Sequence, residues 1–272
     1  SYIYWSYPFT SREDSHKLAG AVVNSYAMLV QNGLNPRIII EEPLTDGVLI
    51  EEGKTKVGND VKIIFLPCAL RYLAQTQEAL RRFVEDGGVL VASYCYGMWL
   101  NIDWAIKLNL YYNYPITSDG LRVNIGGVRV EVPAQGSPYD RAIAKVASGE
   151  VLLSDESGNP VIVRGRYGRG RVYFITYPIE RWLTIDPKPF EARDARLIYG
   201  VILGEEGFRP MNLPKHVQYA RLRSREGEYA VYINHGLADA KINVTGQDVE
   251  TGAMVKGEYL LRARDYRIFR VQ

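Results

Sequence analysis

Along the first 209 residues, short apolar runs alternate with segments in which apolar side chains recur at helical spacing. The short runs show no polar alternation, so they predict strands that are buried on both faces. Residues 14–31 and 75–85 predict amphipathic helices, each ended by glycine. Strands of this kind, separated by helices, predict a parallel sheet that helices cover on both faces. The predicted strands are 3–5, 37–40, 61–66 and 89–92.

The pattern changes after residue 121, where short loops separate the predicted strands. These later elements are strands at 122–133, 150–154, 160–164 and 171–176, and a helix at 190–203. Residues 207–214 are rich in Pro and Gly, which indicates a linker. Beyond the linker, alternation and short turns predict a small antiparallel β-sandwich. The sequence therefore predicts an α/β domain at 1–209 and a β-sandwich domain at 213–272.

Composition excludes several classes of protein. The chain has 272 residues, and 47% of them are hydrophobic, which is enough for a packed core and excludes a disordered chain. The 33 Lys and Arg against 31 Asp and Glu leave a formal charge of +2, so no nucleic-acid partner is expected. No apolar run approaches the roughly 20 residues of a membrane span, so no membrane partner is expected either. Arg (23) outnumbers Lys (10), a usage compatible with a thermophilic source.

The two cysteines, Cys68 and Cys95, could form at most one bridge. Both lie in apolar segments, and we expect two separate buried thiols. The chain begins at Ser1 without Met or a signal-like segment, so we expect a processed product or a fragment of a longer chain. No His/Cys cluster has metal-ligand spacing, and the Gly-rich run at 165–171 lies between strands rather than before a helix. We therefore expect no metal and no cofactor.

The strand at 89–92 runs into a sharp turn in which Cys95 stands two residues before a glycine. This is the shape of a nucleophile elbow, which lifts a thiol above the carboxyl edge of a sheet. It resembles the Gly-x-Cys-x-Gly turn of class I glutamine amidotransferases, with Ser93 at the first glycine. In that family a His and a Glu follow a late strand. Here Tyr177 stands at the His position, and Glu180 is displaced by one residue. Because a tyrosine with a pKa of about 10 cannot act as a base near neutral pH, we prefer a structural turn, with catalysis by Cys95 and Glu180 as the alternative.

A second resemblance extends over about 250 residues. The segments that carry it are a strand ending in Pro (61–67), a strand pair with a Gly-rich turn (159–174), a strand ending in Asn-His (229–236) and a Thr-Gly turn (249–252). In order and spacing they resemble the region that follows the barrel in glycoside hydrolase family 42 β-galactosidases, namely the trimerisation domain and the C-terminal β-sandwich. The resemblance implies an amidotransferase-like (flavodoxin-like) doubly wound sheet without the catalytic His, and a homotrimer.

In that family two catalytic glutamates lie on a (β/α)8 barrel, and no barrel fits in this chain beside the two domains. The resemblance therefore implies a non-catalytic accessory and oligomerisation region of a glycoside hydrolase, with the barrel upstream in the same polypeptide. We expect no catalytic residue in this chain and no activity of the chain alone. Two alternatives remain open: an independent hydrolase that uses Cys95, and a free-standing carbohydrate-binding protein.

An aromatic-rich segment follows the elbow and includes Tyr96, Trp99 and Trp104. Aromatic rings stack on sugars and also anchor protein interfaces. These three residues are therefore the candidate contacts for carbohydrate or for another copy of the chain. Packing in the core is the competing interpretation.

Overall fold

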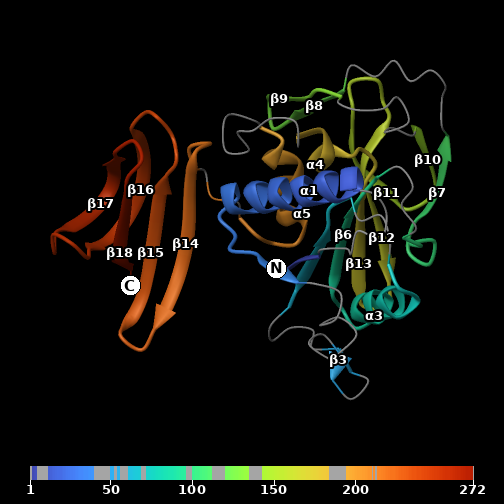
Figure 1. The fold of residues 1–272 in the computed structure, drawn as a ribbon, viewed down its shortest axis with the longest axis horizontal. Helices are drawn as coiled ribbons and strands as arrows, with labels where there is room; N and C mark the ends of the chain where they lie inside the picture. Colours follow the sequence, from blue (N-terminus) through green and yellow to red (C-terminus); the bar gives the residue numbers. More distant parts are fainter. Residues whose placement is uncertain are drawn as a thin grey trace. The chain divides into compact units, whose positions relative to one another are not determined.

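The structure is a computed structural model, shown in Figure 1. It describes residues 2–4, 12–39, 50–51, 54–55, 61–68, 72–95, 100–111, 120–134, 143–183, 194–209, 211 and 213–271. The chain divides into two compact units. The first comprises Ser1–Tyr26 and Arg37–Pro187, and the second comprises Ala27–Pro36 and Lys188–Gln272.

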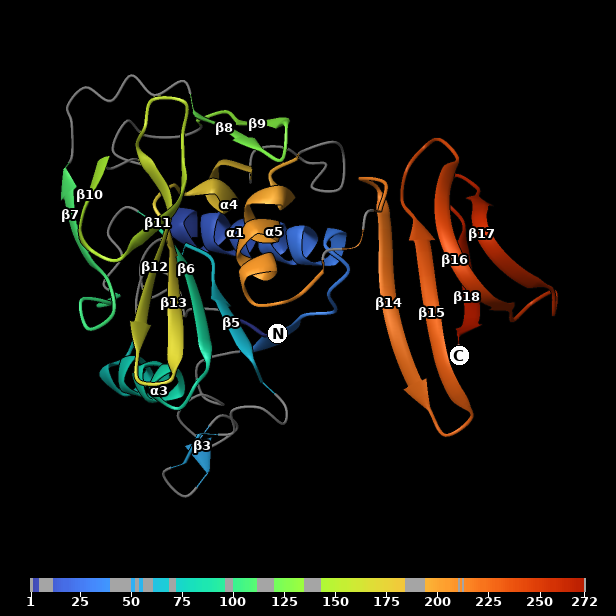
Figure 2. The ribbon, with the colours of Figure 1, turned by 180° about the vertical axis from the view of Figure 1, so that it is seen from behind.

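The first unit is built on a seven-stranded mixed sheet with the strand order β11-β12-β13-β6-β5-β1-β2. Five strands run parallel, and β12 is antiparallel to both of its neighbours. Numbered along the chain, the parallel strands follow the flavodoxin-like order 2-1-3-4-5. Figure 2 shows β12, β13 and β6 side by side. The strands are β1 (Tyr2–Tyr4), β2 (Arg37–Ile39), β5 (Ile63–Leu66), β6 (Val89–Ser93), β11 (Glu150–Ser154), β12 (Pro160–Tyr167) and β13 (Gly170–Ile175). The sequence pattern predicted all seven, with small shifts at their ends.

The helices are α1 (Arg12–Gln31), α3 (Ala74–Glu85), α4 (Ile179–Trp182) and α5 (Arg196–Glu205). The predictions of helices at 14–31 and 75–85 are confirmed. The predicted helix at 190–203 corresponds to α5, but residues 184–193 lie outside the described part of the chain.

Helices cover both faces of the sheet, which explains why its strands carry unbroken apolar runs. Leu90 and Ala92 of β6 point to one face and belong to the same core cluster as Phe83 of α3. Cys95, which follows β6 on the opposite face, contacts Ala21 of α1. All five residues of β6 are therefore buried.

The Gly-rich run between β12 and β13 is a tight turn packed against the end of α3. Gly168 has a φ of 54°, and a Cβ there would lie 2.4 Å from the carbonyl oxygen of Glu85. A Cβ at Gly170 would lie 2.1 Å from the carbonyl oxygen of Val84. The Arg169 N–H donates to the Glu85 carbonyl at 2.9 Å, while the Arg169 side chain faces solvent. The glycines thus permit a close approach of two backbones, as a hairpin requires.

Short strand pairs complete the described part of the first unit. They are β3 (Ile50–Glu51) with β4 (Lys54–Thr55), β7 (Lys107–Tyr111) with β10 (Ile143–Ser148), and β8 (Leu121–Ile125) with β9 (Val128–Val132). The prediction of one strand at 122–133 is wrong, because Gly126 and Gly127 take φ values of 58° and 83° and turn the chain into a hairpin. The pairing of β7 with β10 has no counterpart in the predicted elements.

The second unit contains an all-antiparallel, five-stranded sheet in the order β14-β15-β18-β16-β17. Its strands are β14 (Val217–Ser224), β15 (Gly227–Asn234), β16 (Ala240–Asp248), β17 (Met254–Leu261) and β18 (Tyr266–Val271). β16 meets β18 only at the pairs that join Gln247 to Arg270 and Asp248 to Phe269. The β16–β17 hairpin can therefore turn away from the β14–β15–β18 ladder, and both parts contribute to one core around Phe269. The arrangement is sandwich-like, as the alternation predicted.

The second unit also includes α5 and the end of α1, which the sequence pattern assigned to the first domain. The Nδ2 of Asn32 donates to the Arg196 carbonyl at 2.9 Å, and the Nε2 of Gln31 donates to the Lys215 carbonyl at 2.8 Å. These bonds join segments that are far apart in sequence. The observed division therefore does not follow the predicted linker.

One buried side chain holds the end of β15 in place. The Nδ2 of Asn234 donates to the carbonyl oxygens of Ala238 (3.0 Å), Leu261 (3.2 Å) and Arg262 (2.9 Å). Its Oδ1 accepts the N–H of Gly236 at 2.9 Å. The side chain thus ties the strand end to two separate turns of the backbone.

We expect Asn234→Ala to lower the free energy of unfolding by about 2–4 kcal/mol, because several buried backbone groups lose their partner. Asn243→Ala, at an exposed position of β16, is the matched control and should cost less than about 0.5 kcal/mol. Urea unfolding followed by fluorescence measures both. Equal losses in the two variants would contradict the role given to Asn234.

Candidate functional site

The predicted nucleophile elbow lies at the carboxyl edge of the seven-stranded sheet, and its sulfur is bonded. Cys95 forms a disulfide with Cys68, and the two Cα atoms are 4.8 Å apart. The prediction of two separate buried thiols is therefore wrong. The alternative in which Cys95 acts as a nucleophile needs a free thiolate, and the bonded sulfur does not supply one.

The register of β5 and β6 explains why these two cysteines meet. The strands are parallel neighbours, and Leu66 pairs with Ala92 near their ends. Cys68 and Cys95 each stand two residues beyond their strand, so both emerge at the same edge. A cysteine at this position after each of two successive buried strands is a signal that sequence reasoning missed.

Local contacts fill this edge of the sheet. The backbone of Cys68 has a φ of 47°, an uncommon value for a residue other than glycine, and its N–H donates to the Ser93 hydroxyl at 2.8 Å. The Tyr94 N–H donates to the Ile175 carbonyl at 2.7 Å, which joins the ends of β6 and β13. Cys68 and Cys95 are each only 1% exposed. The disulfide is therefore closed to a substrate in solution.

Tyr177, at the position of the amidotransferase His, is a buried hydrogen-bond donor. Its hydroxyl donates to Asp155 Oδ2 at 2.6 Å, and its ring packs edge-on against Trp182 at 5.8 Å between centroids. Burial alone would raise the pKa of Asp155, but hydrogen bonds from Tyr177, Asn159 and Ser157 outweigh it and hold the pKa below its usual value. The pair therefore stabilises a carboxylate and provides no base.

Glu180 lies in the single turn of α4 and is fully buried. Its carbonyl oxygen accepts a hydrogen bond from Asn24 Nδ2 at 2.9 Å, which links α4 to α1 within the first unit. A carboxyl group in this position is closed to solvent, so Glu180 is a buried residue of the core.

Of the three aromatic candidates, Trp104 is the one that the structure describes; Tyr96 and Trp99 lie outside the described residues. Trp104 is half-buried, and its indole N–H donates to the Asn101 carbonyl at 2.9 Å. Its ring meets Tyr167 edge-on at 4.9 Å, and the guanidinium of Arg81 lies 5.6 Å from the centre of that second ring. Trp104 is thus packed beside the core and keeps a partly exposed surface.

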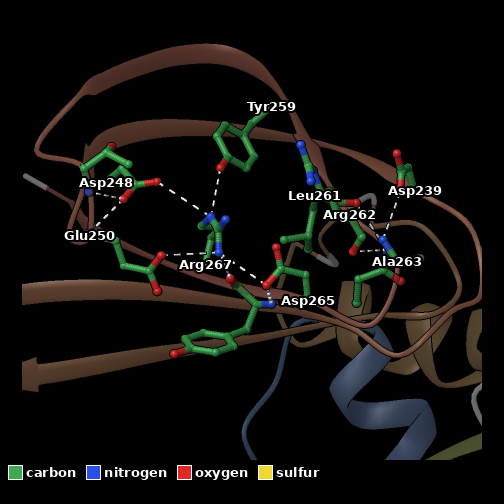
Figure 3. A network of polar contacts seen from close by, with 12 residues as sticks. Asp239, Asp248, Glu250, Tyr259, Leu261, Arg262, Ala263, Asp265 and Arg267 are labelled. Carbon is green, nitrogen blue, oxygen red and sulfur yellow. Dashed lines mark hydrogen bonds and ion pairs between the residues drawn. The ribbon is translucent and has the colours of Figure 1, made fainter.

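The second unit contains a polar network that the sequence analysis did not predict (Figure 3). Arg267 Nε donates to the Tyr259 hydroxyl at 3.0 Å, and Nη1 donates to Asp265 at 3.3 Å and lies 3.4 Å from Glu250. The buried Asp248 lies 4.0 Å from Nε and accepts two backbone N–H groups of the next turn. The hydrogen bond to Tyr259 and the neighbouring carboxylates raise the pKa of Arg267 above its usual value. This network fastens the β16–β17 turn to β18.

Within the described residues, no group of three or more His, Cys, Asp or Glu side chains could hold a metal ion. No helix in that part of the chain is both long enough and apolar enough to cross a membrane.

The fold class is a mixed α/β sheet with helices on both faces, joined to an all-antiparallel sheet. No family model and no curated protein sequence matches the chain. Among solved structures, the chain is similar in fold to part of several β-galactosidases.

The β-galactosidase from Bacillus circulans sp. alkalophilus matches with a TM-score of 0.65 and 17% identity, over 99% of this chain and 41% of that chain. A catalytic mutant of Gan42B, a GH42 β-galactosidase from G. stearothermophilus, matches with a TM-score of 0.63 and 16% identity, over 98% and 39%. The enzyme from the Antarctic haloarchaeon Halorubrum lacusprofundi matches with a TM-score of 0.64 and 11% identity, over 99% and 39%. This chain thus spans about 40% of the length of these proteins. The resemblance to part of them is confirmed as a likeness of fold.

We expect Cys68→Ala to lower the free energy of unfolding by about 2–4 kcal/mol, because the bridge closes a loop with a sequence separation of 27. Cys95→Ala should give the same loss, and the double variant should lose no more than either single one. Iodoacetamide should label neither cysteine of the wild-type chain when it is unfolded in urea without reductant. Labelling under those conditions, or an unchanged stability of the single variants, would contradict the bridge.

We expect Tyr177→Phe to lower stability at pH 7 by about 1.5–3 kcal/mol, because a carboxylate loses a hydrogen bond. The pKa of Asp155 is lowered on folding. Its contribution to stability is therefore present above the unfolded value of about 3.9 and is lost as the pH falls through the lower, folded value. The deficit of the variant should shrink as the pH falls from 7 to 3 in urea titrations, while exposed Tyr266→Phe should show no deficit at either pH. A deficit independent of pH would rule out the link to Asp155.

Proposed function

We propose that the chain is a non-catalytic accessory and oligomerisation region of a glycoside hydrolase. Its (β/α)8 catalytic barrel would lie upstream in the same polypeptide, outside these 272 residues. The observation that carries the proposal is the coverage of the structural matches. Nearly the whole chain matches β-galactosidases, yet it spans only about 40% of their length. Hydrolysis would then be the work of the remaining part of the parent protein.

The α/β unit would be of the amidotransferase-like type without the chemistry of that family. The parallel strand order 2-1-3-4-5 and the sharp turn after β6 support this assignment. The sulfur of Cys95 is bonded, and the hydroxyl of Tyr177 is committed to Asp155. A sheet edge filled in this way favours a supporting role over catalysis.

Two of the described carboxylates also favour inactivity of the chain alone. Glycoside hydrolysis needs two carboxyl groups about 5–5.5 Å or 6.5–9.5 Å apart, one of them an acid with a raised pKa. Hydrogen bonds from Arg81 and Arg82 lower the pKa of Glu78 to about 2, and the pKa of Asp155 is lowered as well. Carboxyl groups held as anions in this way cannot protonate a leaving group near neutral pH.

For self-association we propose a homotrimer that uses the aromatic-rich segment. Trp104 is partly exposed beside Tyr167 and Arg81. Trp, Tyr and Arg are enriched among the residues that contribute most of the binding energy at protein interfaces. This composition supports Trp104 as a contact to another copy of the chain.

We expect the purified chain to associate and to be inactive on its own. Multi-angle light scattering should give a mass above that of a monomer, and Trp104→Ala should shift it towards the monomer, because it removes a large aromatic contact. The chain should not hydrolyse aryl β-galactosides or soluble β-glucans, whereas a product that includes the upstream coding sequence should.

Leu237→Ala, at an exposed position of the second unit, is the matched control and should leave the measured mass unchanged. A monomer at high concentration would contradict the oligomerisation role. Turnover by the chain alone, abolished by Cys95→Ala or Glu180→Gln, would contradict the accessory role and favour an independent hydrolase.

A further inference from the structure

The C-terminal sheet contains a hollow of about 550 Å³. This volume lies within the range of small-molecule sites. The residues around the hollow come from β15, β16, β17 and β18, all in the second unit. They are Gly227, Thr245, Gly246, Gln247, Met254, Lys256, Arg270 and Val271.

The strand register places polar side chains together at this hollow. Gln247 is paired with Met254 on one side and with Arg270 on the other. Thr245 is paired with Lys256, two residues further along the same strands. Directly opposed residues project to the same face of a sheet, so these five side chains share the outer face.

The two cations of the hollow lack carboxylate partners. Within the described residues, neither Lys256 nor Arg270 forms an ion pair; Arg270 Nη2 donates only to the backbone carbonyl of Glu226. Two carboxylates of the neighbouring strands are engaged elsewhere: Glu258 pairs with Lys241, and Glu228 with two arginines of β14. Because no acidic side chain lines the hollow, its charge is positive.

Arg267, on the same strand as Arg270, does have carboxylate partners. It faces the core side, where Asp248, Glu250 and Asp265 surround it (Figure 3). Arg270, three residues further on, projects to the other face. One arginine of β18 is thus satisfied within the protein, and the other is available to a ligand.

Glycines set the position of Arg270. A Cβ at Gly246 would lie 2.7 Å from the Arg270 carbonyl oxygen, so only glycine lets β16 and β18 approach this closely. A Cβ at Gly227 would lie 3.2 Å from Arg270 Nε. The guanidinium therefore lies over a bare turn and is held there by one backbone bond, which reduces the entropy lost when it binds.

We propose that this hollow binds an acidic saccharide, with the carboxylate or sulfate of the sugar between Arg270 and Lys256. Charge-assisted hydrogen bonds from a guanidinium and an ammonium group suit such an anion. The Thr245 hydroxyl and the Gln247 amide can bond sugar hydroxyls, and Met254 offers an apolar edge. The anion part of the proposal follows from the hollow alone, whereas the choice of a saccharide rests on the proposed function.

The experiment is a calorimetric titration of the full chain at 50 mM NaCl with four probes: tri-galacturonate, galactose 6-sulfate, neutral galactotriose and inorganic sulfate. We expect tri-galacturonate or galactose 6-sulfate to bind at least about tenfold more tightly than galactotriose, because of charge-assisted hydrogen bonds. Binding should weaken at 300 mM NaCl, since salt screens exposed charges.

Variants then locate the site. Arg270→Gln and Lys256→Gln should each weaken binding of the acidic sugar by about tenfold or more, because each removes one charge-assisted contact. Lys241→Gln is the matched control: it removes the same charge from the outer face of β16, outside the hollow, and should change affinity less than twofold. Arg270→Lys keeps the charge and should lose less affinity than Arg270→Gln, because an ammonium group still contacts the anion. Melting curves of each variant verify that the fold is retained.

Each remaining outcome counts against the proposal. Equal binding of galactotriose would overturn the role of the anion, and inorganic sulfate binding as tightly as the acidic sugars would overturn the saccharide. An equal loss of affinity in Lys241→Gln would show a general effect of charge in place of binding at the hollow. No heat with any probe up to a concentration of about 10 mM would refute the site. None of these readings depends on the oligomeric mass or on turnover, so failure of the proposed function would be seen separately.

Discussion

The register between β5 and β6 is the constraint on which the first unit depends. It pairs Leu66 with Ala92 at the carboxyl edge and sends alternate side chains to opposite faces. The side chains of β6 on one face pack against α3. On the opposite face, Cys95 contacts Ala21 of α1. A slip by one residue would exchange the two faces and separate the two cysteines. Pairing, helix packing and the disulfide therefore support one another.

The same geometry decides what the elbow can do. A sharp turn after a central strand raises one side chain above the sheet, and in an enzyme that side chain attacks a substrate. Here the neighbouring strand presents Cys68 at the same height, so the raised sulfur forms a covalent link between strands. Ser93 holds the backbone of Cys68, and Tyr177 holds a carboxylate. At this edge the polar groups therefore make contacts that stabilise the protein, and the sulfur is not free to react.

The sequence was sufficient for those features that depend on neighbours along the chain. The unbroken run in β6 and the periodicity of residues 75–85 predicted a strand and a helix where the structure has them. Features that depend on distant partners were missed. β7 and β10 are separated by more than thirty residues, and a separation of 27 between the cysteines says nothing of distance until the strand order is known. The carboxylates around Arg267 come from two separate turns, β16–β17 and β17–β18. The interface candidates Tyr96 and Trp99 lie outside the described residues.

The two arginines of β18, Arg267 and Arg270, differ in whether the protein provides carboxylate partners for their charge. The Arg267 side chain is 25% exposed, and the three carboxylates and the Tyr259 hydroxyl around it stabilise its charge and join the β16–β17 turn to β18. Arg270 is exposed, and water can satisfy its guanidinium, so folding does not require it to have an acidic partner. Other cations of the same sheet, such as Lys241, nevertheless have one. The unpaired charges gather where glycines open a hollow, so a ligand from outside the chain explains this arrangement better than stability does.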